Sequence, residues 1–391
     1  MGESLIRTVF VLPSLMRAGA ETQVVNLVNG LDSACFEKHL FVFEQQLDQL
    51  DRVDRDRVCF HHHLRRHKYD IRPAIQLARL IDERHIDIVY CTLQIALFVG
   101  WLAIRLAKHK PRFVLNLQTT VNRNLKDELF DRFFYQWLMR SCNPVICACQ
   151  AQENHWQAKF SFLRGRTVVI YNGVDTEWFD PDKGAVRGER LREQHHIPED
   201  AFVACCIAAF RPEKGHRYLL QAFKQVVSAH PNAFLLLAGD GPLRVKMELF
   251  AKETGLSKQV LFLGVLNDVR PVLAASDISI IASTAVETFS LAMLESLAMG
   301  VPMVMTDIGG AREAIRPGNT GVLVRAGDTQ SLANGILEMA KDTSQRMMMG
   351  AQARRFVCDN FARERMIRET AQILHDEVPD EGAALGYGNS A

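Results

Sequence analysis

The chain has 391 residues, of which 48% are apolar, so it is long enough for two or three packed domains. Its 46 lysines and arginines almost balance its 45 acidic residues, which gives a formal net charge of +1. This balance provides no bulk attraction to nucleic acid. A fibrous, disordered or nucleic-acid-binding protein is therefore not expected.

No apolar run reaches the roughly eighteen residues that cross a bilayer, and the first residues lack a basic region followed by a long apolar stretch. We therefore expect a cytoplasmic protein. The nine cysteines lack the paired spacing of a zinc site, which predicts buried, reduced thiols.

The first half of the chain alternates short apolar runs with longer amphipathic segments. Residues 7–13 predict a strand, and a loop through Gly19 leads to apolar residues at helical spacing from Ala20 onward. Further strands are predicted at 40–43, 86–91, 113–117 and 145–148, with amphipathic segments at 71–84 and 125–139. This alternation is typical of a parallel sheet covered by helices.

The same pattern then starts again. Strands are predicted at 201–209, 233–238, 260–263, 278–281, 302–305 and 321–324, with helices after Gly215 and after the turn GDGP at 239–242. The fold class is therefore α/β, with two doubly wound units joined near residues 172–199. A ligand site is expected in the cleft between them, at the carboxyl ends of the strands.

The segment 282–310 carries the most chemical information. Glu287 falls in the loop after a predicted strand, and Glu295, eight residues later, falls in the second turn of a helix that starts near Ser290. Two carboxylates can accept protons from the hydroxyl groups of a polyol, while backbone amides at a helix start favour a phosphate. This combination suits a nucleotide sugar.

These residues also carry a family resemblance. Glu287 and Glu295, followed by MGVP at 299–302 and DIGG at 307–310, resemble the Glu-x7-Glu signature of the retaining glycosyltransferases of family 4. Further matching motifs occur in the order of that family: IYNGVD at 170–175, RPEKG at 211–215, GDGP at 239–242 and FLG at 262–264.

The resemblance implies the GT-B fold, in which two Rossmann-like doubly wound parallel-sheet domains face each other across a cleft. It implies an acceptor-side domain at residues 1–173 and a nucleotide-sugar domain at 174–360. A helix at 361–378 would return to the first domain, and 379–391 would form a mobile tail.

Roles around the reacting bond follow from the same resemblance. Lys214 would place its ammonium on the donor diphosphate, and Arg211 would join it. Glu287 would contact the transferred sugar and Glu295 the ribose hydroxyls. The family pattern has an arginine five residues before this lysine, where the present chain has Ala209.

The remaining donor contacts implied by the resemblance lie in three loops of the second domain. Backbone amides at the start of the helix would meet the distal phosphate, and the loop after a strand would border the base. The residues concerned are Phe289, Ser290, Leu291, Ala292, Gly264, Val265, Leu266 and Gly241.

In the first domain, RAGAE at 17–21 resembles the glycine-rich loop of the family, with Gly19 as its flexible point. A glycine between a strand and a helix is equally expected simply to make the turn. Many members have a histidine at the end of the strand 113–117, where this chain has Gln118, followed by Thr119 and Thr120. Gln118 can orient a sugar by hydrogen bonds but cannot carry a proton at neutral pH.

Three other features are given little weight. The run HHHLRRH at 61–67 is interpreted as an exposed basic loop, and Asp54 with Asp56 lies in a charge-rich stretch, so no metal or other cofactor is proposed. The aromatic segment 130–137 is interpreted as a helix packed on the first sheet. Peripheral membrane contact, at the inner membrane face, is the second interpretation of that segment.

The sequence thus predicts a retaining hexosyltransferase that moves a sugar from a UDP- or GDP-sugar to a hydroxyl of a sugar, lipid-linked or glycan acceptor. Polysaccharide or lipid-linked glycan biosynthesis is the expected setting. The alternative is a nucleotide-sugar-binding or regulatory protein of the same fold, weakened in catalysis, which Ala209 and Gln118 favour. A GT-B sugar epimerase is a third alternative that no particular residue supports.

Overall fold

The computed structural model describes residues 5–378 except 68, 119–130 and 286. Contacts within the chain divide it into two compact units. Unit 1 comprises Met1–Tyr171 and Glu364–Ala391, and unit 2 comprises Asn172–Arg363. The predicted tail at 379–391 and the first part of the predicted helix 125–139 lie outside the described residues.

Unit 1 is built on a parallel sheet in the order β3-β2-β1-β4-β5-β6-β7. Its strands are β1 Ile6–Leu12, β2 Phe36–Val42, β3 Val58–His62, β4 Ile88–Thr92, β5 Arg112–Leu117, β6 Val145–Cys147 and β7 Thr167–Val169. Its helices are α1 Gly19–Gly30, α2 Arg72–Arg84, α3 Gln94–Leu106, α5 Gln136–Met139, α6 Gln150–Lys159 and most of α15 Arg363–Asp376. Short 3-10 turns lie at Leu50–Arg52 and Ser161–Leu163, and a π-helix lies at Asp131–Tyr135.

Alternate residues of these strands enter two separate cores, because successive side chains of a strand point to opposite faces. Phe10 and Tyr90 lie in the core beneath α1, which also receives Met366 and Leu374 of α15. Val9 and Val89 lie in the core beneath α2, α3 and α5. Both faces are therefore covered, as a parallel sheet requires.

Helix α15 is fitted closely to unit 1. A Cβ atom on Gly30, the last residue of α1, would lie 2.2 Å from Cδ1 of Ile367, and the ring of His375 lies 4.9 Å from that of Phe36. Glycine at position 30 therefore permits α15 to approach the end of α1.

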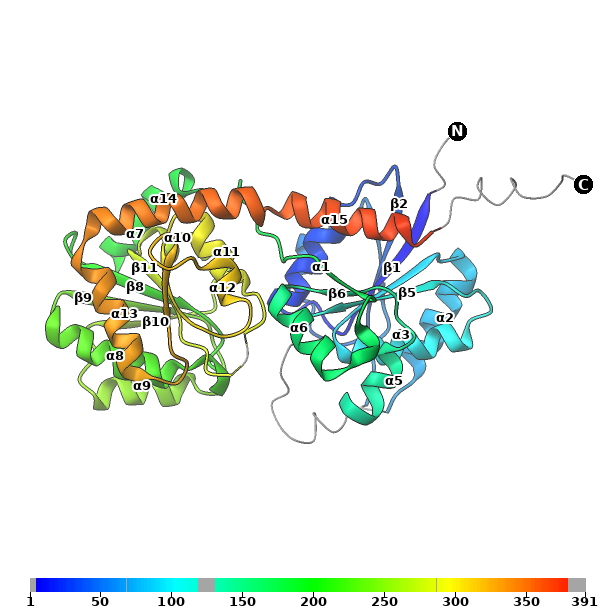
Figure 1. The fold of residues 1–391 in the computed structure, drawn as a ribbon, viewed down its shortest axis with the longest axis horizontal. Coiled ribbons are helices and arrows are strands. Elements are labelled where there is room, and N and C mark those ends of the chain that lie inside the picture. The colour runs from blue at the N-terminus through cyan, green and yellow to red at the C-terminus, as the bar shows by residue number, and fades with distance from the viewer. Residues whose placement is uncertain (1–4, 68, 119–130, 286, 379–391) are drawn as a thin grey trace, which may run out of the picture. The chain divides into compact units, whose positions relative to one another are not determined.

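Unit 2 repeats the plan with the strand order β10-β9-β8-β11-β12-β13. Its strands are β8 Phe202–Ile207, β9 Ala233–Ala238, β10 Val260–Gly264, β11 Ile278–Ile281, β12 Met303–Thr306 and β13 Gly321–Val324. Its helices are α7 Pro181–Gln194, α8 His216–Ala229, α9 Arg244–Glu253, α10 Arg270–Ala274, α11 Leu291–Ala298, α12 Ala311–Ala314, α13 Thr329–Lys341 and α14 Thr343–Asn360, with a 3-10 turn at Pro212–Lys214. Within unit 2, α8, α9 and α13 lie on one side of the sheet, and α7 and α10 on the other (Figure 1). The predicted fold class, two parallel-sheet α/β units, is confirmed.

Several predicted elements need correction. The segment 172–199, interpreted as a joining region, contains helix α7, whose start is capped by the Asp180 side chain and Pro181. Strand β3 was not predicted because VCFHH, at Val58–His62, contains two histidines. Strand β7 has only three residues, too few to show a pattern.

The described helices include none that is long and apolar enough to cross a membrane. Six cysteines are buried, as predicted, but Cys59 is exposed and Cys35 and Cys358 are half-buried. Cys59 is exposed because it lies on β3, an edge strand.

The predicted exposed histidine loop is partly wrong, because His61 lies in β3. His61 Nε2 lies 3.0 Å from Nδ1 of the buried His39, and His39 Nε2 lies 3.0 Å from Glu37 Oε1. If His61 donates to His39 and His39 to Glu37, every contact is satisfied with both rings neutral. Burial, together with the smaller effect of positive charge on His39, His63 and Arg84, lowers the pKa of His61 to about 4.

This arrangement predicts acid sensitivity of unit 1. The unfolded chain binds a proton on His61 below its ordinary pKa of about 6.5, whereas the folded chain does so only near 4, so stability is complete above that range and falls between the two values. The thermal midpoint should therefore fall less between pH 7.5 and 4.5 in His61→Gln, which can still donate to His39, than in the parent. An identical pH dependence in the two proteins would contradict this interpretation.

Candidate functional site

The candidate site of unit 2 lies where the strand order reverses. Strand β8 is flanked by β9 on one side and β11 on the other, so the loops that leave β8 and β11 diverge from a shared point at the carboxyl edge. Ligands of doubly wound sheets bind at such a point. The loop after β8 carries Arg211 and Lys214, and the loop after β11 carries Glu287.

Lys214 and Glu287 form an ion pair across these two loops. Lys214 Nζ lies 2.7 Å from Glu287 Oε2, and Ser283 Oγ donates to the same oxygen at 2.8 Å. The side chain of Glu287 is 8% exposed and that of Lys214 is 25% exposed. The carboxylate is therefore held at depth, and the ammonium lies nearer to solvent.

The backbone brings these two loops together through glycine. Gly215 has a φ of 68°, and a Cβ atom at this position would lie 1.9 Å from the carbonyl oxygen of Ala282. The amide of Thr284 donates to the carbonyl of Glu213 at 2.8 Å. The turn that bears Lys214 is thus locked against the end of β11.

A third loop, the one after β12, contacts the backbone of Glu287. Gly309, after β12, has a φ of 57°, and a Cβ atom there would lie 1.7 Å from the carbonyl oxygen of Glu287. The amide of Gly310 donates to the carbonyl of Thr288 at 2.8 Å. The DIGG turn therefore fixes the backbone on which Glu287 stands.

His216 follows Gly215 directly in the chain and is 3% exposed. Its ring stacks on Phe210 with centroids 4.1 Å apart, and neither ring nitrogen has a hydrogen-bond partner among the described residues. Burial, and secondarily the charge of Lys214, lowers the pKa of His216 to about 4. The imidazole is therefore neutral near pH 7 and adds no charge beside Lys214.

Helix α11 begins after the loop that carries Glu287. Ser290 is its N-cap residue but its side chain does not cap the helix, and Leu291 and Ala292 are half-buried in the first turn. The amides of the first turn are the groups that an anion can satisfy. Glu295 is half-buried in the second turn, as the spacing predicted.

Phe289 has a different environment from its neighbours. Its side chain is 3% exposed and meets the ring of Phe361 edge-on at 5.1 Å, and its carbonyl accepts from Asn172 Nδ2 at 2.8 Å. The structure therefore gives Phe289 an anchoring position for the loop. Its contact with a ligand stays a prediction.

The segments at the carboxyl ends of β8, β9 and β10 also contact one another through their backbones. A Cβ atom on Gly239 would lie 2.2 Å from the carbonyl oxygen of Ala208, and one on Gly241 would lie 2.8 Å from that of Phe210. The amide of Gly239 donates to the carbonyl of Gly264 at 2.7 Å. Val265 is 60% exposed, while Leu266 is partly buried against the sheet.

Arg211 lies in the loop after β8 and is half-buried. It is the N-cap residue of the turn Pro212–Lys214, and its carbonyl accepts from the amide of Lys214 at 3.1 Å. Arg211 and Lys214 thus belong to the same short turn. Ala209, where the family pattern has arginine, lies in the same loop and is half-buried.

The two candidates of unit 1 lie at the carboxyl edge of its own sheet. Gly19 is the first residue of α1, after the loop that leaves β1, and Gln118 follows β5. Gln118 Nε2 donates to Asn116 Oδ1 at 3.1 Å. Thr119 and Thr120 lie outside the described residues.

The buried Gln49 fixes the loop before Gly19. Its Nε2 donates to the carbonyl of Met16 at 2.7 Å, and its Oε1 accepts from Thr22 at 3.0 Å and from Arg52 at 2.8 Å. The glycine-rich loop is therefore tied to the segment after β2. Gln49 and Ser283 were missed by the sequence reasoning, because each acts through another residue, and Gly309 was noted only as part of the DIGG motif.

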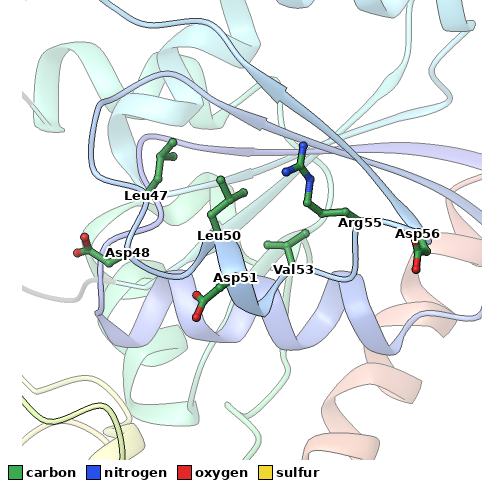
Figure 2. Close-up of a pocket in the computed structure, with 7 residues that line it drawn as sticks. All are labelled: Leu47, Asp48, Leu50, Asp51, Val53, Arg55 and Asp56. Carbon is green, nitrogen blue, oxygen red and sulfur yellow. The ribbon is translucent and has the colours of Figure 1, made fainter.

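An open cavity of about 630 Å³ lies beside that segment and is lined by Leu47, Leu50, Val53, Arg55, Asp48, Asp51 and Asp56. Figure 2 shows the three carboxylates pointing apart rather than toward a common point. Among the residues that the structure describes, no group of three His, Cys, Asp or Glu side chains could hold a metal ion.

Comparison with known proteins identifies the family. The profile described as "Glycosyl transferases group 1" matches residues 188–356, and that of "Glycosyltransferase Family 4" matches residues 17–178. The chain belongs to the group 1 glycosyltransferases. The first profile covers the described loops with Lys214, Glu287 and Gly309, and the second covers Gly19 and Gln118.

Three curated relatives are similar to the chain. The N-acetyl-alpha-D-glucosaminyl L-malate synthase of Bacillus anthracis is 33% identical over 54% of each chain. The putative glycosyltransferase EpsD of Bacillus subtilis is 28% identical over 76% of this chain and 78% of its own. A GDP-mannose-dependent monoacylated alpha-(1-6)-phosphatidylinositol monomannoside mannosyltransferase of Corynebacterium glutamicum is 34% identical over 53% of this chain and 55% of its own. The match thus spans about half the length of the first and third.

A solved structure shows the same fold. The crystal structure of Anabaena Alr3699/HepE in complex with UDP and glucose matches 95% of this group 1 chain and 99% of its own, with a TM-score of 0.83 and 22% identity. The chain therefore has the GT-B fold of two Rossmann-like domains, as the sequence predicted.

The support of Glu287 by Gly309 can be tested against a matched glycine. Alanine costs about 1 kcal/mol in a left-handed backbone conformation, and Gly318 also has a positive φ but nothing within 4 Å of an added Cβ. Gly309→Ala should lower the thermal midpoint clearly more than Gly318→Ala, because its Cβ would displace the backbone of Glu287. Equal shifts of the midpoint in the two variants would show that the contact with Glu287 does not matter.

Proposed function

We propose that this group 1 glycosyltransferase moves a sugar from a nucleotide diphosphate sugar to an acceptor hydroxyl with retention at the anomeric carbon. The observation that carries the proposal is the Lys214–Glu287 pair at the strand-order reversal of unit 2. It offers a cation and a buried carboxylate within one small site, where a donor presents anionic phosphates next to sugar hydroxyls.

Lys214 is assigned to the diphosphate and Glu287 to the transferred sugar. Lys214 is the more exposed of the two, so its ammonium can turn to a phosphate while Ser283 continues to hold the Glu287 carboxylate. Arg211, on the same turn, is assigned to the same diphosphate. These cations stabilise the negative charge that develops on the departing phosphate.

The remaining donor contacts are assigned by position. The amides of Leu291 and Ala292, after Ser290, are assigned to the distal phosphate, and Glu295 to the ribose hydroxyls. Gly264, Val265 and Leu266 are assigned to the border of the base, where Gly241 allows close approach. Phe289 is assigned a supporting place in the loop.

A same-face reaction accounts for retention without a protein nucleophile. The bond from the anomeric carbon to the phosphate oxygen breaks as the acceptor oxygen bonds to that carbon on the same face. The acceptor proton passes to the departing phosphate oxygen. In this reaction Gln118 needs only to orient the sugar by hydrogen bonds, so the lack of a histidine does not prevent transfer.

The similar proteins support the substrate classes without fixing them. The Anabaena structure is a complex with UDP and glucose, and the name of the Corynebacterium relative includes GDP-mannose and a phosphatidylinositol monomannoside. We infer a UDP- or GDP-sugar as donor and no metal or other cofactor. The acceptor is inferred to be a sugar, a glycan or a lipid-linked molecule. It is assigned to the domain of residues 1–173, near Gly19. A cytoplasmic protein of glycan biosynthesis is the corresponding setting.

The second candidate function is a nucleotide-sugar-binding or regulatory protein. The alanine at position 209 and the glutamine at position 118 are the observations that favour it. It differs from the first candidate in turnover and not in donor binding.

Donor binding is tested with Lys214→Ala and the control Lys258→Ala, since Lys258 is an exposed lysine of the same unit. Calorimetric titration with UDP-glucose and GDP-mannose should show binding of at least one of them. The dissociation constant should rise by about tenfold in Lys214→Ala, because a charged contact is lost, and stay unchanged in Lys258→Ala. Absence of binding to every nucleotide sugar tested would overturn the donor assignment.

Transfer is tested with Glu287→Gln, which keeps the shape of the side chain and removes its charge. A purified enzyme should convert the identified donor at ordinary turnover, and the variant should lose about 10²–10³-fold in kcat. NMR of the product should show the anomeric configuration of the donor. Donor binding with no turnover in the parent would favour the second candidate, and an inverted product would overturn the proposed mechanism.

A further inference from the structure

One flank of unit 1, formed by the π-helix, α5 and the end of α3, exposes large apolar side chains. Phe133 in the π-helix is 75% exposed, Trp137 in α5 is 48% exposed, and Leu106 at the end of α3 is 52% exposed. Their neighbours Phe134 and Leu138 pack inward on the core. Helices α3 and α5 lie on the same side of unit 1 (Figure 1). Large exposed apolar side chains on adjacent helices are typical of an interaction surface.

A cation is fixed among these rings. The centroids of Trp101 and Trp137 lie 4.8 Å apart, and Cζ of Arg105 lies 4.7 Å from the ring of Trp101 and 5.5 Å from that of Trp137. The segment 130–137 was predicted mainly as core packing. In the described part, Phe134 and Tyr135 pack against the core, as predicted, and Trp137 packs on Trp101 but remains half exposed.

The flank is also basic, although the whole chain is nearly neutral. The stretches 93–118 and 133–149 contain no Asp or Glu, and their basic residues Arg105, Lys108, Lys110, Arg112 and Arg140 are all exposed. The acidic residues next to them are Asp131, which begins the π-helix, and Asp82, which accepts from the amides of Lys108 and His109. Arg166 adds a further charge beside them by donating to the carbonyls of Arg140 and Cys142.

Three of these cations, Arg105, Lys110 and Arg112, border a groove of about 560 Å³. Trp101, Arg105, Lys110, Arg112 and Asn143 line it, together with one acidic residue, Glu377. Burial raises the pKa of Glu377, and the positive charge of Arg112 opposes that shift. The groove therefore presents several cations next to an indole ring, a combination that suits an anionic phosphate group.

We propose that this aromatic and basic flank docks unit 1 on an anionic phospholipid surface. Trp137 and Phe133 would lie among the lipid headgroups, where aromatic rings are favoured, and Arg105 and Arg112 would meet lipid phosphates. Phe133 and Leu106 have no polar group, so they gain from a hydrocarbon boundary and would gain little from an acidic glycan. A lipid surface is therefore favoured over a glycan as the occupant.

The groove does not belong to the candidate reaction site of unit 1. Arg112 starts β5 and Asn143 precedes β6, so the groove lies at the amino edge of the sheet, whereas Gly19 and Gln118 lie at the carboxyl edge. The groove is thus away from the carboxyl edge, whereas Tyr135 of the π-helix lines a small cavity together with Gln118. The proposal does not depend on the transfer reaction, because binding to lipid needs neither donor nor acceptor.

Co-sedimentation of the full chain with vesicles tests the proposal. Vesicles of phosphatidylcholine with phosphatidylglycerol should bind the protein about tenfold or more better than phosphatidylcholine alone, and added salt should weaken the binding. Phe133→Ser and Trp137→Ser should each reduce binding severalfold. Arg105→Gln combined with Arg112→Gln should reduce both the binding and its dependence on salt.

Trp178→Ser is the matched control. Trp178 is 51% exposed and has Arg270 stacked at 3.5 Å, but it belongs to unit 2. It should bind vesicles as the parent does, and every variant should keep its transfer rate with a soluble acceptor. The proposal would be overturned if the protein bound both vesicle types equally, or if Trp178→Ser lost as much vesicle binding as Trp137→Ser. Binding of an acidic polysaccharide without binding of vesicles would also overturn it. Phe133→Ser keeps the test decisive if the tryptophan variant misfolds, because Phe133 is largely outside the core.

Discussion

The half-buried ion pair between Lys214 and Glu287 is the interaction around which the loops of the candidate site in unit 2 are arranged. A carboxylate that is 8% exposed needs compensation for its lost hydration, and here it receives an ammonium and the hydroxyl of Ser283. The three loops around it have the backbone conformations that this placement requires. Gly215 and Gly309 have positive φ angles, and an added Cβ on either would lie within 2 Å of a carbonyl oxygen. Charge, hydrogen bonding and backbone geometry therefore agree on one arrangement.

The same pair explains how a site can be prepared for a charged ligand. Without an anion, the positive charge of Lys214 is neutralised by Glu287, and His216 stays neutral because burial lowers its pKa to about 4. In the proposed function, an arriving phosphate would compete for an ammonium that is already positioned and only partly buried. The cost of ordering the lysine is thus met in folding rather than in binding. A buried carboxylate that keeps its serine partner can then turn to hydroxyl groups.

Much of the fold was predictable because buried parallel strands have strong local signals. Residues 233–238, 278–281 and 321–324 were predicted with the bounds that the structure has, since each is a short apolar run between turn residues. The polar edge strand β3 and helix α7 were missed, because pairing and capping rather than periodicity define them. The loop position of Glu287 and the helical position of Glu295 followed from spacing. The contacts of Ser283, Gln49 and Gly309 did not, because tertiary contacts between loops leave no local pattern.

Helix α15 has a consequence for the order in which the protein folds during synthesis. Unit 2 is one continuous segment, Asn172–Arg363, and can close as soon as that segment is complete. Unit 1 is discontinuous, and its core beneath α1 receives Met366 and Leu374 from α15. Until those residues emerge, the apolar surface of unit 1 that they cover stays open to water and to chaperones. The unit that is synthesised first is therefore the one that is completed last, in contrast to the usual order in proteins of several domains.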